Sequence, residues 1–126
     1  MRLLPLLLIL AACAAPRADG PTREQEELSR ELAGREAGAA QNCISATQSS
    51  SLNIVDNSTL SYRQGDTIWV NRLAAPCPGM RPLDTLVVEL HGSEYCRNDR
   101  IRPLQTGSRI PGPTCFLGDF VPYRRR

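Results

Sequence analysis

Five cysteines, one histidine and two neighbouring glutamates are the residues of this chain that could do chemistry. Four of the cysteines, at positions 43, 77, 96 and 115, are spread widely and contain no Cys-x-x-Cys pair. A zinc site or a thioredoxin-like redox centre needs such closely spaced ligands or thiols. We therefore expect no metal site and no cofactor.

His91 is the only histidine, so any imidazole base must be this residue, with Glu89 and Glu94 as nearby carboxylates. His91 stands beside Gly92 in a stretch that is expected to form a hairpin turn, where an exposed histidine without a catalytic role is the simpler interpretation. No Gly-x-Ser-x-Gly motif accompanies it. We expect no catalytic residue, and a small hydrolase with a site near His91, Glu89 and Glu94 is the alternative.

Residues 1–12 have the order of an export signal: Arg2, a short apolar run, then Ala11 and Ala12. About eight apolar residues cover only ~12 Å of helix, far less than the ~30 Å hydrocarbon core of a bilayer. The sequence Leu10-Ala11-Ala12-Cys13 resembles the lipobox of bacterial lipoproteins. The resemblance implies cleavage before Cys13 and lipid attachment there, whereas a plain signal peptide that is removed together with Cys13 is the alternative.

Acyl chains on Cys13 would attach the protein to a lipid bilayer and place it on the periplasmic face of the bacterial envelope. Ala14, rather than Asp, follows the cysteine, and by resemblance to enterobacterial sorting this favours the outer membrane over the inner one. The expected partners are the bilayer, through Cys13, and an unidentified envelope protein or polymer. A net charge of +2, carried by arginine without lysine, is too small to predict nucleic acid as a partner.

Composition divides the remaining chain near residue 42. Residues 13–41 contain no aromatic residue, and their first part has little to bury. Thr22 and Gln25 form a capping-box pattern that predicts a helix start, but Leu28 and Leu32 alone make a thin apolar stripe. We expect a flexible or partly helical tether over 13–41, which as coil would reach ~30 Å and hold the domain clear of the head groups. A partner-binding helix is the alternative.

Residues 42–126 have the composition of one small all-β domain, with β-branched and aromatic residues between turn signals that recur every eight to twelve positions. The pattern predicts an antiparallel sheet or barrel-like meander of about six strands. We expect these strands near 44–55, 58–64, 67–73, 84–90, 95–103 and 115–123.

An even number of cysteines in an exported domain predicts two disulfides. In an up-and-down meander, Cys43 and Cys96 would lie at one rim of the sheet, and Cys77 and Cys115 at the other. A strand of six residues spans ~20 Å, whereas bridged Cα atoms lie within ~7 Å. Strand parity therefore favours Cys43–Cys96 with Cys77–Cys115. Cys43–Cys115 with Cys77–Cys96 would follow if the 77–84 link crossed to the other rim.

The order of short motifs around the cysteines carries a second resemblance. Asn71-Arg72-Leu73 precedes Cys77-Pro78-Gly79, Asp99-Arg100-Ile101 follows Cys96, and Leu117-Gly118-Asp119-Phe120 follows Cys115. Together with Cys43 and the 55–60 segment, these motifs resemble an uncharacterised family of short four-cysteine envelope proteins of sphingomonads and related proteobacteria. The resemblance implies a small β fold with cysteine bridges, and it implies no activity and no catalytic residue.

The sequence thus predicts a non-catalytic binding or structural module in the envelope. Addition of a strand to the sheet of a partner is one form that such a module takes. The competing prediction is a small hydrolase of envelope polymers that uses His91, Glu89 or Glu94.

Overall fold

The computed structural model describes residues 20–46 and 51–126, so the expected signal and Cys13 lie outside the described residues. The described part contains the helix α1 (Arg23–Leu32) and ten strands. The strands are β1 (Arg35–Ala37), β2 (Cys43–Ser45), β3 (Asn53–Asp56), β4 (Thr59–Gln64), β5 (Thr67–Arg72), β6 (Thr85–Val88), β7 (Glu94–Cys96), β8 (Arg100–Leu104), β9 (Cys115–Phe116) and β10 (Phe120–Arg125). None of the described residues belongs to a helix with the length and apolar character needed to cross a membrane.

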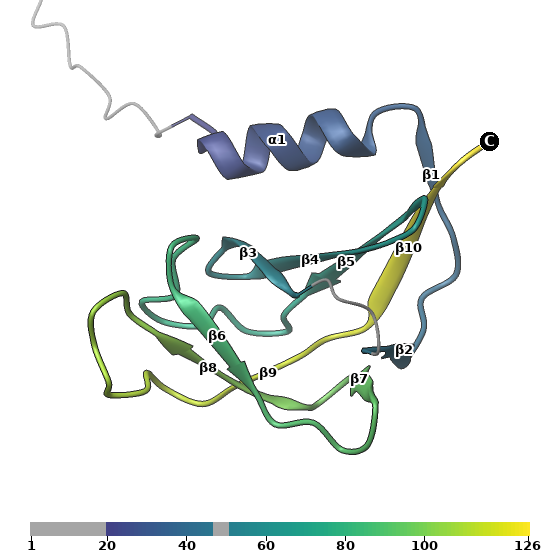
Figure 1. The fold of residues 1–126 in the computed structure, drawn as a ribbon. Helices are drawn as coiled ribbons and strands as arrows, with labels where there is room; N and C mark the ends of the chain where they lie inside the picture. Colours follow the sequence, from purple (N-terminus) through teal and green to yellow (C-terminus); the bar gives the residue numbers. More distant parts are fainter. Residues whose placement is uncertain (1–19, 47–50) are drawn as a thin grey trace, which may run out of the picture.

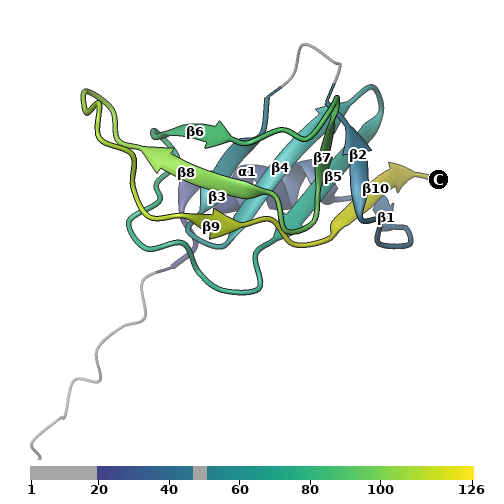
Figure 2. The same ribbon diagram turned by 90° about the horizontal axis from the view of Figure 1, so that it is seen from below.

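The strands form three antiparallel sheets. The largest has the order β1-β10-β5-β4-β3 and lies between α1 on one side and two smaller sheets, β6-β8-β9 and β2-β7, on the other (Figure 1). Seen from below, β6 and β8 run across the strands of the large sheet rather than along them (Figure 2). The all-β prediction is confirmed.

Alternation along β4 and β5 separates two hydrophobic cores. Leu60, Tyr62 and Trp69 face the small sheets and pack in the main core with Phe120 of β10. Ile68 of β5 points to the opposite face and packs beneath the helix. Because side chains alternate across a strand, one hydrophobic strand can supply both layers.

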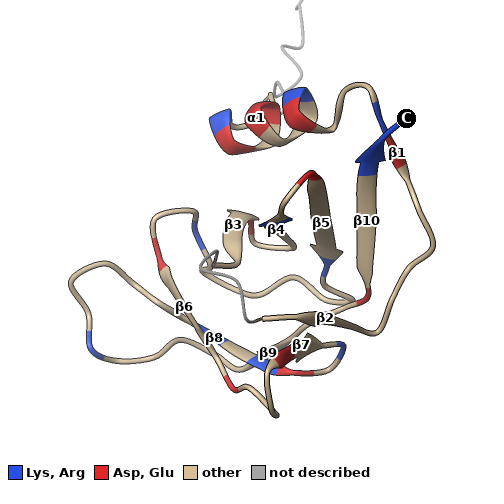
Figure 3. Ribbon diagram, turned by 45° about the vertical axis from the view of Figure 1, so that its right-hand side comes forward, with Lys and Arg blue, Asp and Glu red and all other residues tan. Residues whose placement is uncertain are grey.

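The helix begins where the capping box predicts, since the Thr22 side chain accepts from the Gln25 N–H and the Gln25 side chain accepts from the Thr22 N–H. Leu28 is buried against the large sheet. The charged residues of α1 lie on its other faces, and Figure 3 shows acidic and basic segments along the helix. Leu28 and Leu32, which form only a thin apolar stripe in the sequence, both pack on this face of the large sheet.

Residues 22–41 were expected to belong to a flexible or partly helical tether over 13–41, but they contain a helix that packs on the β domain instead of standing apart from it. After the helix, β1 pairs with β10, the Gly38 N–H donates to the Pro122 carbonyl at 2.7 Å, and Gln41 forms a bridge with Phe120. These backbone pairs, together with the buried Leu28, make the segment part of the domain.

Three of the six predicted strands are each divided in two. The 44–55, 95–103 and 115–123 stretches give β2 and β3, β7 and β8, and β9 and β10, and in each case the two halves join different sheets. Between β7 and β8 the chain turns at Asn98, whose φ is 69°, and the Asp99 carboxylate accepts from the Cys96 N–H at 2.8 Å. Such a turn changes the direction of the chain, so that the residues before it and after it pair with strands of different sheets.

Two disulfides connect the parts, Cys43–Cys96 and Cys77–Cys115. They are the two pairs that strand parity favours. Cys43 and Cys96 lie directly opposite each other in the β2-β7 pair and are partly exposed, whereas Cys77 and Cys115 are buried in the main core. The first bridge therefore fastens a small two-stranded sheet, and the second joins the link after β5 to β9.

Candidate functional site

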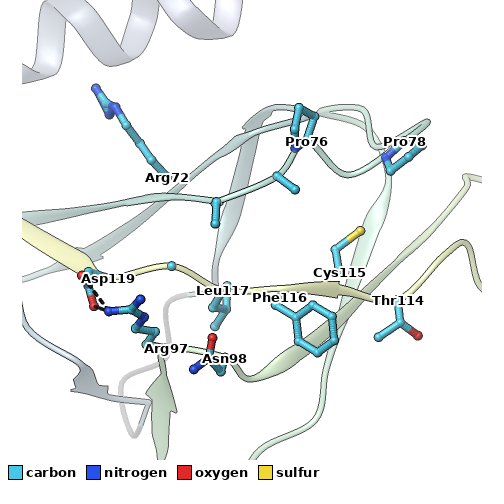
Figure 4. A pocket seen from close by; sticks show the side chains of 13 residues that line it. Arg72, Pro76, Pro78, Arg97, Asn98, Thr114, Cys115, Phe116, Leu117 and Asp119 are labelled. Atoms are coloured by element: carbon cyan, nitrogen blue, oxygen red, sulfur yellow. Dashed lines mark hydrogen bonds and ion pairs between the residues drawn. The ribbon is translucent and has the colours of Figure 1, made fainter.

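A hollow of about 440 Å³ beside β9 is the candidate site, because its lining is largely apolar and carries a few charged groups (Figure 4). We call it the β9 groove. The segment from β9 to Asp119 runs between the Pro76–Pro78 part of the link after β5 and the turn at Arg97 and Asn98. The lining residues are Arg72, Ala74, Ala75, Pro76, Pro78, Arg97, Asn98, Thr114, Cys115, Phe116, Leu117, Gly118 and Asp119.

The groove is held in shape by covalent and polar contacts. Cys115 in its floor is bonded to Cys77 of the opposite wall. The buried side chain of Asn71 donates to the Gly118 carbonyl and accepts from the Gly118 N–H, both at 2.8 Å. This pair of bonds imitates one step of a β ladder, so the amide side chain replaces a missing strand. A Cβ on Gly118 would overlap the backbone oxygen of Arg72, which explains a glycine at this position.

The other wall is joined to the floor through the backbone. The Asn98 N–H donates to the Leu117 carbonyl at 2.9 Å, and the Leu117 N–H donates to the Asp99 carbonyl at 3.0 Å. Because both walls are fixed to the same short segment, the groove is preformed.

The lining is largely apolar, with a few charged groups. Its surface is made largely of alanine, proline and the ring of Phe116, which is 52% exposed. Arg72 and Arg97 add positive charge, and Arg97 contacts Asp119 at 3.5 Å. Among the lining residues there is no histidine, and the one cysteine is in a disulfide. An apolar surface with a few fixed polar groups is typical of a ligand site.

The residues of the hydrolase alternative do not line this groove. Glu89 and His91 are exposed in the link after β6, and Glu94 is exposed at the start of β7. The predicted hairpin at His91-Gly92 is wrong, because β6 pairs with β8 and β7 pairs with β2. The link therefore passes between two sheets.

One cluster in the described part of the chain has the spacing of a metal site. Cys43, Cys96 and Glu94 have their potential ligand atoms within 4.8 Å of one another. The two sulfurs are bonded to each other, however, and metal binding to cysteine requires thiolates. In the disulfide form this cluster does not provide the sulfur ligands.

Phe116 and the Arg97–Asn98 turn are the site residues that sequence reasoning missed. The alternation of buried Cys115, exposed Phe116 and buried Leu117 was the signal available for Phe116. Nothing local indicates that residues 72–78 and 97–98 flank the same strand, since the tertiary fold alone brings them together.

Exposed apolar side chains concentrate around the small β6-β8-β9 sheet. The described residues expose five large hydrophobic side chains, and all five lie in this sheet or in the links next to it: Leu83, Val87, Leu90, Ile110 and Phe116. The large sheet, by contrast, is covered on both faces. The small sheet therefore carries the outward-facing apolar surface of the domain.

Comparisons with protein-family models, with curated proteins and with solved structures find no match.

Proposed function

We propose that this protein is a lipid-anchored, non-catalytic binding module on the periplasmic side of a bacterial envelope, more specifically on the outer membrane. The β9 groove is the observation that supports the binding role, because the groove is preformed, largely apolar and lined by Arg72 and Arg97 without a histidine or free thiol. The ligand is a segment of an envelope protein or polymer that presents apolar groups to Phe116 and a negative group to Arg72. Nucleic acid is not among the proposed partners.

The lipid anchor is tested separately from the groove. Cells that express the chain are labelled with radioactive palmitate, and the protein is compared with a Cys13→Ala variant. We expect label in the wild type and none in the variant, with the labelled protein in the outer-membrane fraction. Labelling that persists in Cys13→Ala would contradict attachment at this residue.

The groove is tested by a photoreactive amino acid at position 116, with position 87 as the matched control. Phe116 and Val87 are both outward-facing residues of the small sheet, and only Phe116 lines the groove. We expect discrete covalent adducts in envelope preparations from position 116 only. Substitution of Arg72 by Ala should reduce the yield of these adducts, because it removes a positive charge from the lining. Arg72 forms no ion pair with any residue that the structure describes, whereas Arg97 pairs with Asp119. Equal adducts from both positions would contradict a specific site.

A further inference from the structure

We propose that one end of the domain docks on the bilayer that carries the acylated Cys13, through two loop tips that hold Leu83 and Ile110. The inference rests on the proposed lipid anchor and names the surface that faces the membrane. The tips are residues 81–84, before β6, and residues 105–111, between β8 and β9. We refer to them together as the paired tips.

The paired tips hold the two most exposed large hydrophobic side chains of the described residues. Leu83 is 85% exposed and Ile110 is 79% exposed. A single exposed aliphatic residue is ordinary, but these two tips are adjacent, since the Thr106 hydroxyl donates to the Leu83 carbonyl at 2.7 Å. Pro82 and Pro111 restrict the backbone next to each side chain. Two strongly exposed aliphatic groups on adjacent loops suit the apolar layer beneath lipid head groups.

Each tip also carries an exposed arginine one or two residues before its aliphatic residue. Arg109 precedes Ile110 and has no ion pair in the part of the chain that the structure describes. Arg81 contacts Asp84, with 3.9 Å between Nε and Oδ1, and remains two-thirds exposed. Arginine side chains at a membrane surface extend their charged ends to the phosphates while their stems stay in apolar surroundings. The arginines of the tips therefore suit the phosphate layer of a membrane surface, and the aliphatic residues suit the apolar layer beneath it.

The position of the anchor segment selects the same end of the molecule. Glu24 in the first turn of α1 lines a hollow together with Arg81, Leu83 and Thr106, so the helix start lies beside the paired tips. Figures 1 and 2 place the helix start and the β8–β9 link in one half of the domain and the C-terminus at the other extreme. Because Glu24 is acidic, the proposed contact is made by the loops and not by the helix.

The length of the chain then brings this end to the bilayer. Residues 22–41 pack on the domain, so the stretch from Cys13 to Gly20 is what separates the anchor from the described structure. At ~3.5 Å per residue this stretch spans no more than about 25 Å. The expectation that a long tether holds the domain clear of the head groups is thereby replaced by a short connection beside two protruding apolar tips.

The test measures the depth of single tryptophans in the full-length acylated protein, reconstituted in vesicles of phosphatidylethanolamine and phosphatidylglycerol with brominated acyl chains. The variants are Leu83→Trp, Ile110→Trp and, as the control, Leu90→Trp. Leu83 and Leu90 are both exposed leucines, one before and one after β6. The emission of buried Trp69, measured in the wild type, is subtracted. We expect bromine quenching and a blue shift for Leu83→Trp and Ile110→Trp, and neither for Leu90→Trp.

Quenching of Leu83→Trp and Ile110→Trp no greater than that of Leu90→Trp would overturn the docking while leaving the anchor intact. The anchor has its own readout in the same sample, namely flotation of the wild type with the vesicles. If the acylated wild type does not float, the lipid-anchor proposal fails and the docking fails with it. Loss of quenching in Leu83→Trp when Arg81 and Arg109 are both replaced by Gln would further support contact with the head groups.

Discussion

Tyr62 shows what a single buried polar atom contributes. Its side chain is fully buried, and its ring meets that of Tyr95 edge to face at 5.6 Å between centroids. Its hydroxyl finds no hydrogen-bond partner among the described residues. Burial, and then the proximity of Tyr95, raises the pKa of Tyr62 above 10.0, so the hydroxyl stays neutral. The ring stabilises the core, whereas the oxygen loses its contact with water without a replacement.

Replacement of Tyr62 by Phe should therefore leave the free energy of unfolding unchanged or raise it by up to about 1 kcal/mol, because the unpaired hydroxyl is removed and the aromatic contact is kept. Tyr62→Ala is the control and should lower stability by about 3–5 kcal/mol through loss of the ring. Urea unfolding of the three proteins measures both. A loss in Tyr62→Phe that approaches that of the alanine variant would mean that the hydroxyl is bonded.

Asn71 differs from Tyr62 because its polar atoms are hydrogen-bonded, so their removal should destabilise the fold. Asn71→Ala leaves the N–H and the carbonyl of Gly118 without their partner, and we expect it to lower the free energy of unfolding by about 2–4 kcal/mol. Gly118→Ala should also destabilise, because its Cβ would overlap the Arg72 backbone. Gly20→Ala is the matched control, since a Cβ there meets nothing within 4 Å. Equal stability of Gly118→Ala and Gly20→Ala would contradict the close approach.

At the scale of elements, one short polar chain fastens α1 to the sheet. Gln25 caps the helix and also donates through Nε2 to Asp56 Oδ2 at 2.9 Å, at the end of β3. The second oxygen of Asp56 accepts from the Ser58 N–H at 2.8 Å and so shapes the turn into β4. Burial raises the pKa of Asp56, but the hydrogen bonds from Gln25, Ser58 and Thr59 outweigh it and hold the pKa below 3.8. The ionised carboxylate is thus favoured in the folded state.

A group whose folded pKa is depressed contributes stability above its unfolded pKa and loses that contribution as the pH falls through the folded value. Asp56→Asn should accordingly be less stable than the wild type near neutral pH, by about 1 kcal/mol, and the gap should close as the pH falls below 3.8. Asp66→Asn, an exposed position in the β4–β5 turn, is the control. Denaturant unfolding across this pH range measures the gap, and a pH-independent difference would contradict the role of the charge.

The sequence predicts well those elements that local patterns determine. The 58–64 and 67–73 predictions match β4 and β5 closely, because alternation and a glycine turn at Gly65 specify that hairpin. The divisions inside the longer strands depend on partners far along the chain, such as Asn71 for Gly118. The groove is harder still to predict from the sequence, since its lining comes from three separate segments, near 72–78, 97–98 and 114–119. The Cys77–Cys115 bridge is the part of the site that strand parity predicted.

The two disulfides act on the molecule as a whole. They join residues 53 and 38 positions apart, and the chain-entropy model gives each about 4 kcal/mol of stabilisation. They differ in access, since Cys43 and Cys96 are partly exposed whereas Cys77 is fully buried. Attack on a disulfide requires that a thiolate reach one of its sulfurs.

Mild reduction of the folded protein should therefore open Cys43–Cys96 before Cys77–Cys115. Alkylation of the released thiols, followed by peptide mapping at successive times, identifies the order. We expect modified Cys43 and Cys96 first, in a protein that still unfolds cooperatively. Simultaneous release of all four thiols would show that opening of the first bridge unfolds the domain.

The order of these cysteines along the chain has a consequence for biogenesis. The bridges interlock, because Cys77 lies within the loop closed by Cys43–Cys96, and Cys96 lies within the loop closed by Cys77–Cys115. On the export route proposed above, the N-terminus leaves the cytoplasm first, and Cys43 and Cys77 emerge before their native partners, so that early oxidation can join them to each other. Recovery then needs thiol–disulfide exchange, which is slow without a catalyst. Reduced, denatured protein should regain both native bridges faster with a disulfide isomerase than with an oxidant alone, and a chain maturing in cells should depend on such an isomerase.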